Sequence, residues 1–312
     1  MSVTAAADVL IIGGGPAAYT AAMYAGRGGL NPIVIEGYAS GGQIALSGHI
    51  DNFPSYPEGI PGAELGDRMR EQAARFGARL VMDDVEAVDL NGPPFTASTM
   101  GGDSYTAKGM VIATGAKARR LGLPSEDEFE GRGVCFCAIC DGPFFAGQRV
   151  AVIGGGDAAA EEALTMSRIA ASVVLVHRRD QFRANASLRA LLPEVENLQI
   201  RTPHVVSEIL GNDMGVNGVR LRDLSDDSEI TEPVDGVFVA IGHDPASAMF
   251  QPWLKVDEHG FLITEEGSTA TAVPGVFAAG DVTDPRYRQA VTAAGAGCQA
   301  AIDVERWLLT QS

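Results

Sequence analysis

Three of the four cysteines in the chain lie within six residues of one another. Two of them belong to the run Cys137-Ala138-Ile139-Cys140-Asp141. Two cysteines separated by two residues can close a small disulfide and reopen as a dithiol, and the thiolate form is the nucleophile. An adjacent acid can relay the proton that this chemistry moves. The run therefore indicates a redox-active pair.

A zinc site is the main alternative for these thiols. The spacing Cys135-x-Cys137-x2-Cys140 supplies three thiols, but no second pair of ligands follows, and the remaining cysteine is Cys298. Structural zinc sites need four ligands, so we expect no metal. Cys298 falls in an alanine-rich segment, where a small buried residue is its expected role.

A glycine-rich turn lies on each side of the redox run. The first follows the apolar segment Asp8–Ile12, which is typical of a buried parallel strand, and it precedes a predicted helix over Tyr19–Ala25. The turn reads Gly13-Gly14-Gly15-Pro16-Ala17-Ala18, and this context matches the dinucleotide-binding fingerprint. Gly13 permits the tight turn, and Gly15 lets the backbone approach a pyrophosphate at the helix N-terminus.

Glu36 ends the next predicted strand, Pro32–Ile35, about twenty residues after Gly15. A carboxylate at this position can accept both hydroxyls of an adenosine ribose and would repel a 2′-phosphate. The first site therefore favours FAD or NAD over NADP. An unliganded glycine turn in an α/β fold is the alternative.

The same pattern restarts in the middle of the chain. An offset of 141 residues aligns Gly13 with Gly154, Gly15 with Gly156 and Glu36 with His177, without a gap. The repeat contains the strands Val150–Ile153 and Val173–Val176 and a helix over Glu161–Ile169. It predicts two Rossmann-like domains in one α/β chain.

Basic residues replace the acid in the second copy. His177-Arg178-Arg179 stands where the first copy has Glu36, and Arg183 follows. Guanidinium groups bind phosphate oxygens in bidentate fashion, so the second site should prefer NADPH over NADH. A solvated basic turn is the alternative interpretation.

The remaining segments suggest how the domains are assembled. The buried strand Met110–Ala113 ends in Thr114-Gly115, where close approach to a nucleotide is possible. A strand over Gly275–Ala278 ends in Ala279-Gly280-Asp281, and residues 292–309 then predict a helix. We expect this terminal segment to complete the first domain. The predicted domains are 1–118 with 246–312 for FAD, and an inserted domain, 119–245, for NADPH and the cysteine pair.

Composition limits the other classes of function. The 312 residues are 46% hydrophobic and carry a net charge of −17, which disfavours nucleic acid and anionic membrane surfaces. The sequence lacks an apolar run long enough for a transmembrane helix, and its start does not resemble a signal peptide. We therefore expect a cytoplasmic location.

The combination of motifs resembles bacterial low-molecular-weight thioredoxin reductase over nearly the whole chain. The resemblance implies a homodimeric FAD enzyme that passes electrons from NADPH through the Cys-x-x-Cys pair to thioredoxin. It is carried by Gly13 to Ala18, Gly42-Gln43, residues 137–141, Gly154 to Ala159, His177-Arg178-Arg179, Arg183, Gly280-Asp281 and Tyr287-Arg288-Gln289-Ala290.

The resemblance also assigns roles to residues. Cys140 would lie next to the flavin, Cys137 would attack the substrate disulfide, and Asp141 would be the general acid. The residues expected at the FAD site are Gly13, Gly15, Pro16, Ala17, Glu36, Gly42, Gln43, Asn52, Ala113, Thr114, Gly115, Gly280, Asp281, Arg288, Gln289 and Ala290. Those expected at the NADPH site are Gly156, Asp157, Ala158, His177, Arg178, Arg179 and Arg183.

The chain departs from the family pattern near the redox run. Cys135 stands where serine is more common, so a third thiol could compete, and Pro143 and Ala146 replace an aromatic and a basic residue in the loop associated with thioredoxin docking. Arg132, Phe144 and Phe145 are the docking candidates that remain.

Three other functions are compatible with parts of the pattern: a reductase of another disulfide carrier, an FAD dithiol oxidase that uses oxygen, and a non-catalytic flavin-binding sensor. In the thioredoxin reductase interpretation, the cysteine pair and NADPH must reach the flavin from one inserted domain. We therefore expect that domain to rotate about its connections near residues 118–121 and 243–246.

Overall fold

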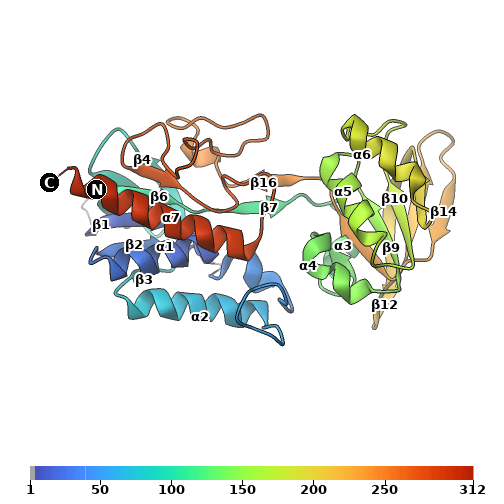
Figure 1. The fold of residues 1–312 in the computed structure, drawn as a ribbon, viewed down its shortest axis with the longest axis horizontal. Helices are drawn as coiled ribbons and strands as arrows, with labels where there is room; N and C mark the ends of the chain where they lie inside the picture. Colours follow the sequence, from blue (N-terminus) through green and yellow to red (C-terminus); the bar gives the residue numbers. More distant parts are fainter. Residues whose placement is uncertain (1–3, 39, 312) are drawn as a thin grey trace. The chain divides into compact units, whose positions relative to one another are not determined.

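The computed structural model describes residues 4–38 and 40–311. These residues form two compact units (Figure 1). The first unit combines residues 4–117 with 244–311, and the second unit consists of residues 118–243. The second unit is thus an insertion in the chain of the first.

The first unit has an α/β architecture built on a mostly parallel sheet. Its elements in chain order are β1 (Ala5–Ile12), α1 (Pro16–Arg27), β2 (Pro32–Ile35), η1 (Gly42–Leu46), α2 (Gly62–Arg75), β3 (Arg79–Val81), β4 (Val85–Asp89), β5 (Phe95–Thr99), β6 (Ser104–Ile112), β7 (Ala116–Ala118), β16 (His243–Pro245), η4 (Ala248–Phe250), β17 (Val276–Ala278) and α7 (Ala290–Leu309).

The sheet of the first unit has the order β3-β2-β1-β6-β5-β4, and β17 also pairs with β6. β1 is parallel to both β2 and β6, so Leu10 lies beside Ile33 on one side and Met110 on the other. Because β1 is central, its apolar side chains are buried on both faces of the sheet. β4 and β5 are antiparallel additions at the β6 side.

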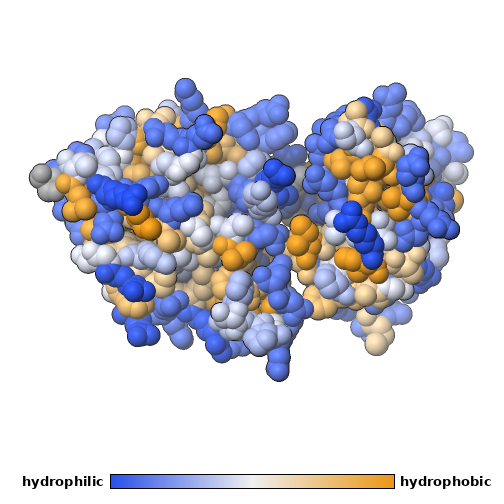
Figure 2. Space-filling model, in the orientation of Figure 1, coloured by the Kyte–Doolittle hydropathy of each residue, from blue (hydrophilic) through white to orange (hydrophobic). Residues whose placement is uncertain are grey.

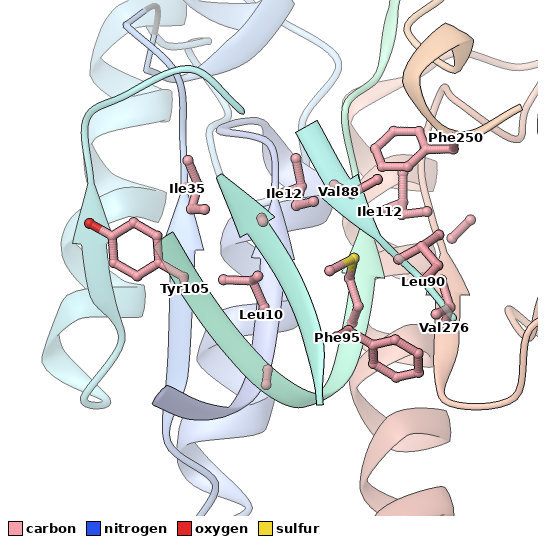
Figure 3. Close-up of a cluster of buried hydrophobic side chains, with 14 of the residues drawn as sticks. Leu10, Ile12, Ile35, Val88, Leu90, Phe95, Tyr105, Ile112, Phe250 and Val276 are labelled. Carbon is pink, nitrogen blue, oxygen red and sulfur yellow. The ribbon is translucent and has the colours of Figure 1, made fainter. Parts of the chain in front are cut away.

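Two buried clusters cover the two faces of this sheet. On one face, Leu10, Ile35 and Ile112 from the parallel strands pack with Phe95 and Tyr105 (Figure 3). On the other face, α1 and α7 pack together through small residues. A Cβ on Gly297 would lie 2.1 Å from the carbonyl oxygen of Ala17, so the contact requires a glycine there.

The second unit repeats the parallel arrangement. Its elements are α3 (Pro124–Phe129), β8 (Val134–Cys135), α4 (Ala138–Asp141), η2 (Gly142–Phe145), β9 (Arg149–Ile153), α5 (Asp157–Met166), β10 (Ser172–Val176), α6 (Ala186–Leu191), η3 (Leu192–Glu194), β11 (Leu198–Arg201), β12 (His204–Asn212), β13 (Gly215–Asp223), β14 (Glu229–Glu232) and β15 (Gly236–Val239).

The order of the main sheet in this unit is β11-β10-β9-β15-β8, and every pairing in it is parallel. β9, β10 and β15 occupy the places that β1, β2 and β6 hold in the first unit. The predicted internal repeat and the two Rossmann-like domains are therefore confirmed. A separate antiparallel sheet of β12, β13 and β14 packs beside the main one.

The helices after both glycine turns begin earlier than the sequence analysis predicts. α1 begins at Pro16 rather than Tyr19, and α5 begins at Asp157 rather than Glu161. In each case the last glycine of the turn is the N-cap, so the turn itself starts the helix. Pro16 suits the first turn because the N–H that it lacks has no partner there in any helix.

The two crossings of the chain between the units run side by side. β7 pairs with β16 to form a two-stranded sheet.

No helix within residues 4–38 and 40–311 combines the length and the apolar character needed to cross a bilayer. Hydrophilic side chains dominate the face in Figure 2, and hydrophobic side chains form smaller groups between them.

Candidate active site

The redox run forms a short helix that starts with a disulfide. Cys137 is the N-cap of α4 and is bonded to Cys140, with the two Cα atoms 5.3 Å apart. The N–H of Cys140 donates to the Sγ of Cys137 at 3.2 Å. Ala138 is buried, whereas Ile139 is 65% exposed. The helix therefore packs its Ala138 side against the protein and leaves its Ile139 side exposed. The cysteine pair that the sequence indicates is therefore a disulfide in this structure.

Asp141 ends α4 close to this disulfide. Its N–H donates to the carbonyl of Cys137 at 3.0 Å. Burial raises the pKa of the Asp141 carboxyl, and a hydrogen bond from the Cys135 thiol partly opposes that rise. An acid whose pKa is raised by burial keeps its proton to a higher pH, as a proton donor to a thiolate requires.

In the first glycine turn, backbone atoms lie so close together that a side chain on Gly13 would not fit. Gly13 has a φ of +130°, and a Cβ there would lie 2.1 Å from the carbonyl oxygen of Ala113. Gly15 is the N-cap of α1, and within the described chain no side chain caps it. The first N–H groups of α1, from Ala17 onward, are therefore open to an anion.

The turn is surrounded by other residues expected at the FAD site. A Cβ on Gly42 would lie 2.9 Å from the Cα of Gly15, and a Cβ on Gly280 would lie 2.8 Å from the Cβ of Ala17. Asp281 follows Gly280, and its Oδ1 is buried without a hydrogen-bond partner among the described residues. Burial, followed by the charge of Asp284, raises the pKa of Asp281 to about 6.

Glu36 lies in a network that the sequence analysis missed. Its side chain is fully buried, and Arg70 of α2 donates to both carboxylate oxygens at 2.8–3.1 Å. The hydroxyl of Tyr19 donates to Glu36 at 2.8 Å and accepts from the N–H of Gly41 at 3.3 Å. The carboxylate that was expected to read the ribose is thus held by two side chains. No local pattern in the sequence links Arg70 to Glu36.

The other FAD candidates lie in the same unit. Asn52 donates to the Oε1 of Gln289 at 3.2 Å, which joins the loop before α2 to the start of α7 at Ala290. The N–H of Arg288 donates to Asp284 at 2.8 Å. Three further candidates lie elsewhere in the unit: Gln43 in η1, and Thr114 and Gly115 in the segment that follows β6.

The second glycine turn reproduces the first. A Cβ on Gly154 would lie 2.3 Å from the carbonyl oxygen of Ala240, as one on Gly13 would meet Ala113. Gly156 is the N-cap of α5, where no described side chain provides a cap and a Cβ would meet nothing within 4 Å. Ala158 lies in the first turn of this helix. The second unit thus has its own open helix N-terminus.

The basic loop after β10 is fixed to this turn. The N–H of Arg183 donates to the carbonyl of Gly155 at 2.7 Å, and Asp157 accepts from the N–H of Asn185 at 2.7 Å. Arg178, Arg179 and Arg183 are exposed. The backbone of Arg183 is therefore held at the turn that starts α5, and the loop that leads to it carries the exposed Arg178 and Arg179.

His177 differs from its arginine neighbours because it is buried, with 6% of its surface exposed. Its ring stacks on Phe182 with centroids 5.2 Å apart, and a Cβ on Gly155 would lie 2.1 Å from the ring. Burial lowers the pKa of His177, and the nearby arginines lower it further, so the ring is neutral at pH 7. Its Nε2 has no partner among the described residues.

Both turns fit an anionic dinucleotide. Each has an open helix N-terminus beside glycines that leave no room for a side chain. Each also holds a buried polar atom without a partner in the described chain, Asp281 Oδ1 in the first unit and His177 Nε2 in the second. A buried polar atom of this kind is costly unless a ligand satisfies it.

Comparisons with known proteins identify the family of this chain. Residues 7–297 match the pyridine nucleotide-disulphide oxidoreductase family. A thioredoxin reductase from Escherichia coli O157:H7 is 48% identical and covers 99% of this chain and 98% of its own. A solved thioredoxin reductase from Giardia duodenalis superposes with a TM-score of 0.94, at 38% identity, over 98% of this chain and all of that one.

One relative carries a different name. A protein from Pseudomonas fluorescens named glucosaminate ammonia-lyase is 47% identical over 96% of this chain and 95% of its own. The family model and the two thioredoxin reductases nevertheless confirm the resemblance expected from the sequence. The chain therefore belongs to the thioredoxin reductase family of pyridine nucleotide-disulphide oxidoreductases.

Proposed function

We propose that the protein reduces the disulfide of thioredoxin with electrons from NADPH, passed through FAD and the pair Cys137–Cys140. The observation that carries this proposal is the disulfide at the start of α4, with the half-buried Asp141 at the end of the same helix. A lyase reaction involves no net electron transfer, so it would leave this pair without a role.

We assign FAD to the first unit and NADPH to the second. Gly15, Gly42 and Asp281 surround the first helix N-terminus, and the loop that carries Arg178, Arg179 and Arg183 is hydrogen-bonded to the second glycine turn through Arg183. Guanidinium groups at the ribose-reading position favour a 2′-phosphate. When bound, FAD and NADPH supply the two electrons that open the disulfide.

The chain's own residues carry the thiol chemistry. The thiolate of Cys137 attacks the disulfide of thioredoxin and forms a mixed disulfide, while one sulfur of the partner leaves. Asp141 gives its proton to a departing thiolate, and burial favours the protonated acid because it raises the pKa of this carboxyl. Cys140 then attacks the mixed disulfide, restores the Cys137–Cys140 bond and releases reduced thioredoxin.

The test is NADPH oxidation by the holoenzyme with and without thioredoxin from the same organism. We expect thioredoxin-dependent turnover, with kcat/KM for NADPH at least about tenfold above that for NADH. Cys137→Ser and Cys140→Ser should abolish thioredoxin reduction, whereas Cys298→Ser, in α7, is the matched thiol control.

Three other results would redirect the proposal. Flavin reduction by NADPH without thioredoxin dependence would indicate another disulfide carrier. Oxygen consumption with a dithiol and no NADPH oxidation would indicate an oxidase. Ammonia release from glucosaminate, measured in the same preparation, would indicate the activity named for the Pseudomonas fluorescens relative.

We also propose that the enzyme is a cytoplasmic homodimer, as the family resemblance implies. Light scattering of the purified holoenzyme measures the first property, and cell fractionation measures the second. A monomeric mass at micromolar concentration would contradict the dimer.

A further inference from the structure

The side chain of Arg119 lies against the segment that follows β15. The N–H of Arg119 donates to the carbonyl of Gly242 at 2.9 Å. A Cβ on Gly242 would lie 3.4 Å from the Nη1 of Arg119, 3.6 Å from its Cδ and 3.8 Å from its Cζ. Arg119 is also exposed. Its guanidinium group therefore runs along Gly242 and stays accessible to a ligand.

Gly242 belongs to the edge of the sheet that carries the second glycine turn. β15 and β9 are parallel neighbours, and their contact continues past both strands, because a Cβ on Gly154 would lie 2.3 Å from the carbonyl oxygen of Ala240. In open α/β sheets, ligands bind outside the carboxyl ends of the strands, at the point where the strand order reverses. In this sheet the order reverses between β9 and β15. Arg119 thus lies at the edge where a dinucleotide is expected.

The first unit differs from the second at the equivalent glycine. Ala113 and Ala240 have the same place beside their glycine turns, so Gly115 and Gly242, two residues further on, correspond to each other. A Cβ on Gly115 would meet no atom of the described residues within 4 Å. The guanidinium group of Arg119 is therefore an addition that belongs to the second unit.

The next residue, Arg120, is directed elsewhere. Its Nη2 donates to Asp127 and its Nη1 to Glu130, each at 2.7 Å. Its Cζ also lies 4.9 Å from the centre of the Phe136 ring. The charge of Arg120 is thus held by carboxylates of its own unit. Of these two consecutive arginines, Arg119 is the one that lies along Gly242.

We propose that Arg119 is a further binding residue of the second site, where its guanidinium group contacts the pyrophosphate of NADPH. The inference rests on the proposed function, which assigns NADPH to the second unit. A guanidinium group can hold phosphate oxygens through two parallel hydrogen bonds. Arg119 is also one of only 23 lysines and arginines in a chain with a net charge of −17.

The position of Arg119 in the sheet favours the pyrophosphate over the 2′-phosphate. The loop with Arg178, Arg179 and Arg183 follows β10, which lies on one side of β9, whereas β15 lies on the other side. The ribose is read at the end of the second strand of such a unit, and the pyrophosphate lies at the glycine turn. Arg119 should therefore bind the part that NADPH and NADH share, and should add nothing to the preference between them.

The test measures the binding of two probes to the oxidised holoenzyme by titration calorimetry. NADP+ carries both the pyrophosphate and the 2′-phosphate, whereas 2′-AMP carries only the 2′-phosphate. We expect Arg119→Gln to raise the Kd for NADP+ at least about fivefold, because a hydrogen bond between charged groups is lost. The Kd for 2′-AMP should stay unchanged. The backbone hydrogen bond to Gly242 does not involve the substituted side chain.

Two further variants complete the test. Arg119→Lys keeps the charge but loses the fork, so it should recover part of the affinity for NADP+. Arg149→Gln is the matched control, because Arg149 begins β9 at the opposite edge of the sheet and pairs with Asp235 at 2.6 Å. It should bind both probes as the wild type does.

Three results would overturn the inference. Unchanged NADP+ affinity in Arg119→Gln would show that the side chain makes no contact with the nucleotide. Equal losses of affinity for NADP+ and 2′-AMP would place Arg119 at the 2′-phosphate. Failure of the wild type to bind NADP+ would contradict the proposed function as well, and it differs from the other two results because it appears without any substitution.

Discussion

Arg70 shows how one side chain changes the meaning of a predicted site residue. Glu36 stands at the expected ribose-reading position, yet its carboxylate is buried and bonded to Arg70 and Tyr19. Arg70 is one-third exposed, so it lies on the solvent side of this pair. A buried carboxylate is tolerated when it is paired in this way, and it becomes costly when its partner is removed.

We therefore predict that Arg70→Ala lowers the free energy of unfolding of the first unit by about 2–4 kcal/mol, because it leaves Glu36 buried without its cation. Both tryptophans, Trp253 and Trp307, belong to the first unit, so urea denaturation followed by fluorescence measures that unit. Arg68→Ala is the matched control on the same helix, since Arg68 pairs with the exposed Glu64 and should matter little. Equal effects of the two variants would contradict the prediction.

Asp281 should make the stability of the flavin-free protein depend on pH. Its pKa is about 6 in the folded chain, above that of an unfolded aspartate. The folded state thus binds this proton more tightly, and the free energy of unfolding falls as the pH rises from about 4 to about 6. The raised pKa corresponds to a total loss of about 3 kcal/mol.

Asp281→Asn should remove that loss. Between pH 4.5 and pH 7.5, wild-type apoprotein should lose about 2 kcal/mol more than the variant in urea denaturation followed by tryptophan fluorescence. Parallel pH profiles of the two proteins would show that Asp281 is not the group responsible. Weaker FAD retention by the variant, measured by flavin fluorescence after dilution, is expected as well.

At the scale of elements, the two glycine turns offer a matched pair of substitutions. A Cβ on Gly13 would meet the Ala113 carbonyl, and one on Gly154 would meet the Ala240 carbonyl, at nearly the same distance. Gly13→Ala should reduce FAD retention, and Gly154→Ala should raise the Kd for NADP+, each by at least about tenfold.

Gly29→Ala provides the control for these variants. Gly29 also has a positive φ, of +83°, but a Cβ there would meet nothing within 4 Å. It should cost only the backbone strain, about 1 kcal/mol, and leave both cofactors bound. Loss of FAD in Gly154→Ala, with NADP+ affinity intact, would reverse our assignment of the two sites.

We propose that the loop between β10 and α6 carries the preference for NADPH. Replacing Arg179 and Arg183 together by glutamine should raise KM for NADPH at least about tenfold and change KM for NADH little, because only NADPH has a 2′-phosphate. Arg189→Gln, on the exposed side of α6, is the control. An equal rise in KM for both cofactors would indicate a general loss of binding instead.

The sequence predicts these elements to different extents for physical reasons. Apolar runs and glycine turns can be recognised within a few consecutive residues. For this reason β1, β9 and both turns were predicted, as was the repeat that relates them. Contacts between distant residues leave no local pattern, so the ion pair between Arg70 and Glu36 was not predicted. His177 was grouped with the arginines beside it, but Gly155 and Phe182 bury its ring. β8, with two residues, is too short to show a period.

At the scale of the whole molecule, each unit has buried clusters of its own. A ligand that binds one folded unit stabilises that unit by mass action. NADP+ at a hundred times its Kd should therefore stabilise residues 118–243 by about 2.7 kcal/mol. Hydrogen exchange should slow in peptides from β9, α5 and the loop after β10.

The fluorescence of the two tryptophans gives an internal comparison, because both lie in the first unit. The midpoint of the fluorescence transition reports the unfolding of the first unit, and it should stay constant as NADP+ is added. The unfolding transition of the second unit, followed by circular dichroism, should move to higher temperature. Slower exchange confined to residues 5–115 would show that NADP+ binds the first unit, which would contradict the prediction.

The pairing of β7 with β16 has a consequence for how such a chain can arise. The N–H of Ala246 donates to the carbonyl of Gly115 on one side of the ribbon, and the N–H of Arg119 donates to that of Gly242 on the other. The segment that leaves the first unit and the segment that returns are therefore neighbours. The coding sequence of the second unit can therefore be inserted into that of the first unit, or removed from it, at a single point. The sheet of the first unit needs no new strand for this change. Module exchange between flavoproteins is simplest at such a junction.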